Sequence, residues 1–553
     1  NASTYIGVYS GQNMKGVHNT FIGYQAGMAF NASGYGTHNV AIGPYVAKKI
    51  DAGSRNIVIG SGDLNIGESA AAQLDDGDDN IIMGYKTGKN IQDGSGHILI
   101  GTEAGQALVG SNSSIAIGYQ SGYKMTGGNN LMIGYKAGYN QTSPEKNIVL
   151  GYQAAYLNKT GDNIIAIGSQ AGYTSNANLK NISIGTEAGY YSIGDNNINV
   201  GYQAGKAASS GVNNTFLGYL SGGYGTDGTN LTGSYNLCLG SETGYGMKEA
   251  SRNVLIGYKA GRDISSGSRN VLIGNYAGYQ STASKNIFIG ITDNDSYGVG
   301  HNSTGGDNIA IGSNVAISNT TGTRNIFVGR EAGEANTTAN QGIAIGYRAS
   351  KDNTLGADNI SIGSEAGRYN VSGQQNINIG YKAGFSDSST GKTFDYNIAI
   401  GREAGTKLQN DKIICIGYRA GMVSTTGIDN IFMGSNAGVA NTTGTKNIYI
   451  GADSGKVAVG ADQNIVVGHN SGSALTGNDN ILMGYKAGED ITGGANNVVI
   501  GSNAMSTSTG GASSCIVIGA NAGLVNQSDD NMFIGKDAGY SNTTGTENIF
   551  IGS

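Results

Sequence analysis

The residues best suited to bind a ligand are aspartates in two segments rich in glycine and polar residues. Carboxylate oxygens are preferred ligands of Ca²⁺, so both segments are candidate calcium sites. A pair of solvated loops is the simpler interpretation, because the calcium-binding nonapeptide of secreted β-rolls is absent from the chain. The candidate residues are Asp75, Asp76, Asp78 and Asp79 in the segment LDDGDDN, and Asp293 and Asp295 in the segment beginning ITDNDS.

Other reactive residue types are scattered. The chain has 5 His and 3 Cys, and none of them stands at the spacing of a metal-ligand or nucleophile–base motif. Gly-rich turns such as GYGTDG are followed by no Lys-Ser/Thr pair, so they are not phosphate-binding loops. We therefore expect no enzyme activity, no catalytic residue and no cofactor, and we expect no metal beyond the two calcium candidates.

The composition indicates an ordered chain that is unlike an ordinary globular domain. Gly accounts for 95 of the 553 residues, Pro for 2 and Trp for none, and only 13% of residues are charged. Disordered chains combine few aliphatic residues with high charge, whereas here aliphatic residues recur regularly. The net charge of −6 offers no basic surface for nucleic acid. No apolar run approaches the length of a membrane-spanning helix, so we expect no membrane insertion.

A short motif repeats along the whole chain, and its consensus is N-I-x-I-G-Y-x-A-G. We number each repeat from the Gly that follows the second aliphatic residue, and we call this Gly position 0. The motif occurs 32 times, from Gly7 to Gly552. Most successive motif glycines are about 17 residues apart, as Gly134 and Gly151 are, and five intervals are longer. A fixed minimum with occasional additions indicates stacked units that carry loop insertions.

The repeat predicts one turn of a parallel β-solenoid. Aliphatic residues at −3 and −1 have the period of a strand, and glycines at 0 and +4 with a TTG-like turn mark the corners. A repeat of about 17 residues is too short for helical hairpins or propeller blades. We therefore expect an all-β fold, a β-solenoid or β-roll with coils of about this length, each strand pairing with its copy one coil on. The five longer intervals should bulge from the corners without interrupting the stack.

Position −4 is usually Asn, and identical amides in successive coils can form a hydrogen-bonded ladder. Turn propensity alone is the alternative explanation for these residues. The residues that we assign to the ladder are Asn56, Asn80, Asn130, Asn147, Asn181, Asn253, Asn270, Asn325, Asn430, Asn447 and Asn548.

Position −2 should point away from the face formed by −3 and −1, yet it too is usually apolar. A strand that is apolar on both faces is covered on both faces. We therefore expect −3 and −1 to fill the interior of the coil, and −2 to contact another copy of the chain. The predicted contact residues are Phe21, Val58, Leu99, Phe216, Leu255, Phe288, Phe327, Phe432, Val499 and Phe550.

Segments such as NIAIGSQAG, NISIGTEAG and NIAIGREAG resemble the β-roll head repeats of trimeric autotransporter adhesins. They resemble still more closely the repeats of bacteriophage tail-fibre proteins, in which NTTGxxNxxIG units run in series. The resemblance covers essentially the whole chain. Both families imply a homotrimeric rod, in agreement with the apolar residues at −2.

The resemblance implies that the chain is the structural shaft of a phage tail fibre that attaches the virion to its host. The alternative is a bacterial surface adhesin or an extracellular matrix filament of the trimeric-autotransporter type. Residues 1–553 are expected to form one continuous domain of about 31 coils, part of a longer fibre. The partner would be the chain itself, with a cell-surface glycan or protein as a possible receptor, and the location would be the virion or the cell surface. The many tyrosines could bind sugars, or they could shield the strand edges by stacking on one another.

Overall fold

The computed structural model describes residues 2–29, 34–62, 69–111, 113–174, 180–223, 231–293, 297–386 and 393–553. It consists of two compact units, Asn1–Thr282 and Ala283–Ser553. In each unit the chain winds as a parallel β-solenoid with coils of the length that the repeat predicts, and the described residues contain no helix. The predicted all-β solenoid is confirmed, while the prediction of one continuous domain stays a prediction.

Each coil contributes one short strand that covers positions −3 to −1 of the motif. In the first unit the strands are β1 (Thr4–Ile6), β2 (Thr20–Ile22), β3 (Val40–Ile42), β4 (Ile57–Ser61), β5 (Ile81–Tyr85), β6 (Ile98–Ile100), β7 (Ile115–Ile117), β8 (Leu131–Ile133), β9 (Ile148–Leu150), β10 (Ile165–Ile167), β11 (Ile182–Ile184), β12 (Ile198–Val200), β13 (Thr215–Leu217), β14 (Leu237–Leu239), β15 (Val254–Ile256) and β16 (Val271–Ile273).

The second unit repeats this arrangement. Its strands are β17 (Ile287–Ile289), β18 (Ile309–Ile311), β19 (Ile326–Val328), β20 (Ile343–Ile345), β21 (Ile360–Ile362), β22 (Ile377–Ile379), β23 (Ile398–Ile400), β24 (Ile414–Ile416), β25 (Ile431–Met433), β26 (Ile448–Ile450), β27 (Ile465–Val467), β28 (Ile481–Met483), β29 (Val498–Ile500), β30 (Ile516–Ile518), β31 (Met532–Ile534) and β32 (Ile549–Ile551).

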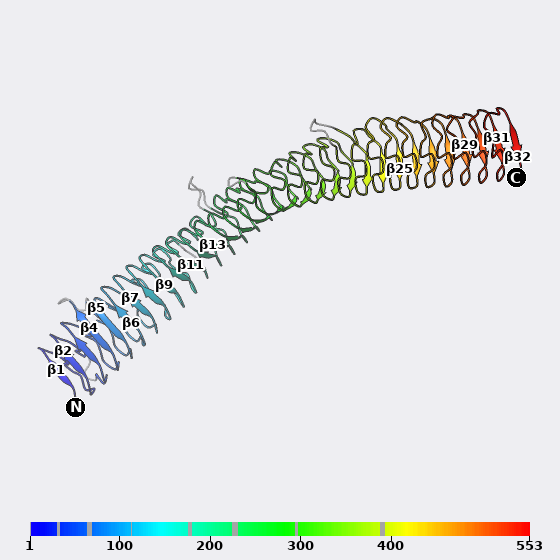
Figure 1. Ribbon diagram of the computed structural model, residues 1–553. Helices are drawn as coiled ribbons and strands as arrows, with labels where there is room; N and C mark the ends of the chain where they lie inside the picture. Colours follow the sequence, from blue (N-terminus) through cyan, green and yellow to red (C-terminus); the bar gives the residue numbers. More distant parts are fainter. Residues whose placement is uncertain are drawn as a thin grey trace. The chain divides into compact units, whose positions relative to one another are not determined.

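Within each unit, every strand pairs in parallel with the strand of the next coil (Figure 1). The register aligns equivalent motif positions, so that Ile343 lies beside Ile360 and Ile345 beside Ile362. Pairing continues across all five long intervals, because β2 pairs with β3, β4 with β5, β13 with β14, β17 with β18 and β22 with β23. The insertions therefore leave the strand stack intact. Parts of these insertions lie outside the described residues.

Left-handed residues form the corners of each coil. In the coil of β9, for example, Lys146 has a φ of 57°, Gly151 of 135°, Gln153 of 51° and Ala155 of 47°. These are positions −5, 0, +2 and +4 of the motif. A φ as large as that of Gly151 is open only to glycine, which explains the glycine at position 0 in the coils that adopt it. The left-handed conformation also costs non-glycine residues free energy, so contacts between coils must compensate for it.

From β2 to β31 the middle residue of each strand, at position −2, is buried in the interior of its own coil. Ala at +3 joins it there, and the largest fully buried side chains include Tyr449, Phe216 and Phe432. Residues at −3 and −1 point outward and are partly exposed. The core of each unit is thus a narrow stack of side chains from position −2, from +3 and, in many coils, from +7, as at Ile91, Leu108 and Ile491.

Candidate functional site

The outward face of the strands carries two parallel columns of aliphatic side chains, from positions −3 and −1. We call these columns the outer stripe. Ile345 and Ile362, neighbours in β20 and β21, are each 37% exposed. Other exposed members include Ile133, Ile148, Ile198, Leu217, Met433, Ile450, Ile465, Met483, Ile500, Ile516 and Ile518. Surfaces of this kind commonly mark contact sites with other molecules, so the outer stripe is the main candidate surface of the chain.

The structure corrects the predicted contact between copies at position −2. Nine of the ten predicted contact residues are buried inside their own coil: Phe21, Val58, Leu99, Phe216, Leu255, Phe288, Phe327, Phe432 and Val499. Only Phe550, in β32, is exposed. The period-2 pattern separated the two strand faces correctly, but because both faces are apolar it did not show which one lies inside. Position −2 is therefore enclosed within the chain, and the strand side chains that remain partly exposed are those at −3 and −1.

Tyrosines at position +1 lie close to the outer stripe in sequence and stack on their copies in neighbouring coils. The ring centroids of Tyr119 and Tyr135 lie 5.3 Å apart, and those of Tyr135 and Tyr152 lie 5.2 Å apart. A second column at +5 joins Tyr123, Tyr139, Tyr156, Tyr173 and Tyr190 at separations of 4.6–5.3 Å. Because the ring faces cover one another in these columns, they are not free to stack on a sugar. The geometry favours the shielding interpretation of these tyrosines.

The asparagines at position −4 form a continuous ladder through most coils. The backbone N–H of Asn447 donates to Oδ1 of Asn430 at 2.9 Å, and its own Nδ2 donates to the carbonyl of Ala461 in the next coil at 2.6 Å. All eleven asparagines that we assigned to the ladder make such contacts between coils, and all are buried except Asn548, which is partly buried. Each coil is thus joined to the next by side chain as well as by strand.

Some coils have another residue at the ladder position, with different consequences. His97 takes over both roles of an asparagine: the Ser114 N–H donates to its Nδ1 at 3.1 Å, and its Nε2 lies 2.7 Å from the Ser111 carbonyl. Ile413 and Gly342 offer no acceptor. Accordingly, the N–H groups of Asn430 and Asn359, one coil on, have no acceptor among the residues that the structure describes.

A second ladder, which the repeat pattern does not predict, lies at position −6, on the other side of the left-handed residue at −5. Here the backbone N–H donates to a side chain of the following coil, which is the opposite direction to the asparagine ladder. Thr445 donates to Oδ1 of Asp462 at 2.6 Å, and Asp462 donates to Oδ1 of Asn478 at 2.8 Å. Ser, Thr, Asp and Asn share this position, so no single residue type marked it.

The predicted calcium ligands make contacts between coils. Asp79 accepts hydrogen bonds from Nε and Nη2 of Arg55 at 2.6 and 2.8 Å, and Arg55 holds the pKa of Asp79 below its usual value. Asp78 accepts the Ser54 N–H at 2.6 Å. Burial, followed by repulsion from Asp51 and Asp76, raises the pKa of Asp75.

Asp293, in the other segment, accepts a hydrogen bond from Nδ2 of Asn314 at 2.7 Å, and Asp295 lies outside the described residues. Among the residues that are described, no three His, Cys, Asp or Glu side chains form a group that could hold a metal ion.

Charged residues alternate at position +2 in six successive coils of the second unit: Glu331, Arg348, Glu365, Lys382, Glu403 and Arg419. Glu331 is nearly buried; Nε of Arg348 donates to it at 2.7 Å, and Lys351 also contacts it. Hydrogen bonds from Arg348 and then Lys351 lower the pKa of Glu331 to about 2. Glu403 and Arg419 repeat the contact at 2.7 Å. These pairs fix neighbouring coils to one another.

The three cysteines are free thiols, and all are buried. Cys238 and Cys415 occupy position −2, inside their coils, where burial raises the pKa of each thiol. They are therefore poorly suited to act as nucleophiles.

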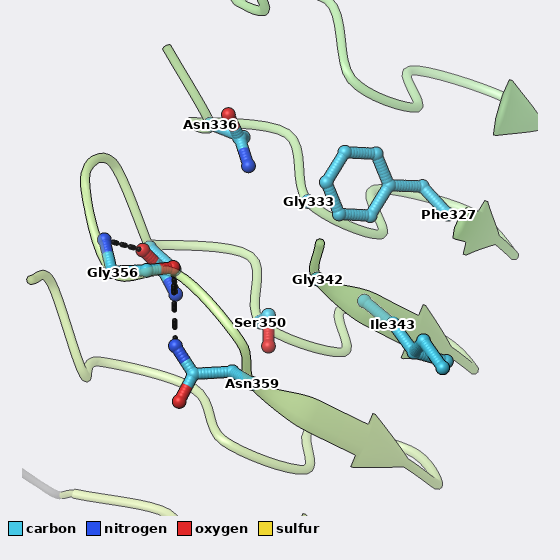
Figure 2. Close-up of a pocket in the computed structure, with 10 residues that line it drawn as sticks. Phe327, Gly333, Asn336, Gly342, Ile343, Ser350, Gly356 and Asn359 are labelled. Atoms are coloured by element: carbon cyan, nitrogen blue, oxygen red, sulfur yellow. Dashed lines mark hydrogen bonds between the residues drawn. The ribbon is translucent and has the colours of Figure 1, made fainter. Parts of the chain in front are cut away.

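A small cavity of about 10 Å³ lies inside the second unit, between the coils of β19, β20 and β21. Figure 2 shows Asn336, Gly342, Ser350 and Asn359 around it. Polar side chains thus surround a space at a point where the ladder position is a glycine.

Comparison of the chain with protein-family models and with curated proteins found no match. No helix among the described residues is long and apolar enough to cross a membrane.

Proposed function

We propose that the chain is the shaft of a phage tail fibre, that three copies assemble through their outer stripes, and that the fibre attaches the virion to the surface of its host. The observation that carries this proposal is the outer stripe itself. Aliphatic side chains at −3 and −1 recur in nearly every coil of both units and remain partly exposed in a single chain.

A single copy of the chain would leave this apolar surface in water. Monomeric proteins rarely expose apolar patches larger than a few hundred Å², and covering apolar surface contributes about 25 cal/mol per Å². The stripe repeats once per coil, so an extended partner must present contacts at the same spacing to cover it throughout. Another copy of the chain has the same spacing, because its coils follow one another at the same repeat. The resemblance to tail-fibre and adhesin repeats supports three copies and a role in attachment.

The assembly test is to substitute two stacked members of the outer stripe, as Ile345→Asp and Ile362→Asp in one chain, and to measure the mass by sedimentation equilibrium. We expect the unchanged chain to sediment as three copies, and the double variant to dissociate into single copies at protein concentrations at which the unchanged chain does not. Thr338→Asp, at an exposed turn outside the strand, is the control and should keep the mass of three copies. A single-copy mass for the unchanged chain would contradict the proposed shaft.

The attachment role needs a separate experiment, since a shaft can be assembled without binding a receptor itself. Fluorescently labelled chain is mixed with a panel of bacterial strains, and cell-bound fluorescence is measured with and without excess unlabelled chain. Binding that saturates on some strains and is competed by unlabelled chain supports attachment. If no strain showed such binding, the proposed attachment role of the chain would be wrong, while the proposed assembly would be unaffected.

A further inference from the structure

The asparagine ladder is interrupted at Gly342, inside the second unit. The N–H of Gly342 donates to Oδ1 of Asn325 at 2.8 Å, so the ladder reaches this coil. Glycine has no side-chain amide, so it offers no oxygen to the N–H of the next coil. The next N–H, that of Asn359, has no acceptor among the described residues, although Asn359 is only 4% exposed. A buried N–H without a partner costs free energy.

A second polar group beside this point also lacks a partner. Oδ1 of Asn336 is buried and accepts no hydrogen bond from the described residues. The equivalent atom one coil on, Oδ1 of Asn353, accepts the N–H of Gly356 at 2.8 Å. One donor and one acceptor therefore remain unsatisfied around the same place, and both residues line the cavity of Figure 2.

The cavity has the right size for one small polar molecule. Its volume of about 10 Å³ is close to the space that one water molecule occupies by the same measure. Two small residues make this room: Gly342 at the ladder position and Ala344 at the strand centre, where neighbouring Phe327 is much larger. Buried waters typically form hydrogen bonds with otherwise unsatisfied polar groups.

We propose that this cavity is a binding site for a single structural water molecule. The water accepts a hydrogen bond from the N–H of Asn359 and donates one to Oδ1 of Asn336. It thereby takes the place of the amide oxygen that an asparagine at position 342 would supply, and it carries the ladder across the interruption.

The direct test is a crystal structure of the unchanged chain at a resolution that shows ordered waters. We expect one density peak within hydrogen-bond distance of the Asn359 nitrogen and of the Asn336 side-chain amide. A cavity without density at that resolution, in a well-ordered region, would overturn the proposal.

The variant Gly342→Asn gives a second, independent test. A Cβ at this position would come no closer than 3.2 Å to another heavy atom, the flexible Oδ1 of Asn325, and the backbone of Gly342 is not left-handed. The new amide should displace the water, remove the density peak and raise the thermal unfolding midpoint. Gly342→Ser, with a smaller side chain, replaces it if the larger residue prevents folding. A peak that persists unchanged beside the new amide would contradict the proposal.

Ile413→Asn is the matched control. Ile413 occupies the same ladder position and is fully buried, so the new side chain replaces an existing one rather than entering a space left by glycine. The substitution supplies an acceptor to Asn430 but displaces no water. A density map of the unchanged chain should therefore show a peak at Gly342 and none at the position of the Ile413 side chain.

Discussion

Nδ1 of His97 accepts a hydrogen bond from the backbone N–H of Ser114, 3.1 Å away in the next coil. The carbonyl of Ser111 can only accept, so Nε2 of the ring must carry the proton that it donates there. His97 is fully buried, and burial is the largest influence on its pKa, which it lowers. The contact of Nε2 with the Ser111 carbonyl acts in the opposite direction, and no charged side chain of the described residues contributes. Only the neutral ring fits this rung of the ladder.

Acidification should therefore weaken the coil of β6. The unfolded chain binds a proton at His97 near pH 6.5, whereas the folded chain binds it only at lower pH. The stability that the neutral ring contributes is thus complete above about pH 6.5 and declines as the pH falls from there towards the lower folded pKa. Urea unfolding at pH 7.5 and 5.5 measures the decline. His97→Asn restores the usual rung and should show a smaller loss between these two pH values; an equal loss in both proteins would refute the role of His97.

Glu331 should stabilise the second unit above the pH at which it is protonated in the unfolded chain. Its pKa is lowered to about 2 by Arg348 and Lys351, so its contribution is complete above about pH 4.5 and disappears as the pH falls through about 2. At pH 7 we expect Glu331→Gln to reduce the free energy of unfolding by about 1–2 kcal/mol, because two charge-assisted hydrogen bonds are lost. Asp79→Asn, at a solvent-exposed pair with Arg55, is the control and should change little. Equal losses of unfolding free energy in the two variants would contradict the view that the buried ion pair of Glu331 stabilises the fold more than the exposed pair of Asp79.

Phe432 should stabilise its own coil at every protein concentration. It is fully buried, and its ring centroid lies 5.4 Å from that of Tyr449 one coil on. Phe432→Ala should cost about 3–5 kcal/mol, as for other buried aromatic residues. Ile450→Ala, on the outer stripe, should have a smaller effect on the unfolding of a single chain and a larger one on association. Chemical denaturation at several protein concentrations separates the two cases. If only Phe432→Ala showed a loss of stability that depends on protein concentration, position −2 and not the outer stripe would make the contact between copies.

Gly134→Ala should be strongly destabilising. Gly134 has a φ of 137°, and an added Cβ would lie 2.4 Å from the carbonyl oxygen of Gly151. Strain and the collision together should cost at least about 2 kcal/mol. Gly110→Ala is the matched control, because nothing lies within 4 Å of its added Cβ and its φ is not positive. Differential scanning calorimetry should show a clear fall in the unfolding midpoint for Gly134→Ala alone; similar midpoints for both variants would contradict the packing at position 0.

The position of every strand could be predicted from the sequence, because the motif fixes strand, corner and ladder residue together. The inward face could not, since a period of 2 distinguishes two faces without saying which is enclosed. A clue lay in the residues themselves. Position −2 varies in size from Ala344 to Phe327 and Tyr449, and it even includes Asn199, which is buried beside Ser183. The ladder at −6 was beyond prediction, because hydroxyl, amide and carboxylate groups substitute for one another there.

The glycines at position 0 also act as a ruler. At these glycines the backbones of successive coils lie close together, since a Cβ added to Gly134 would lie 2.4 Å from the carbonyl oxygen of Gly151. The step from one coil to the next within a unit therefore does not depend on which residues fill the core or the surface. Substitutions change the stability of the stack, but the length of a unit changes only when a whole coil is gained or lost, so the number of motifs in a unit encodes a distance.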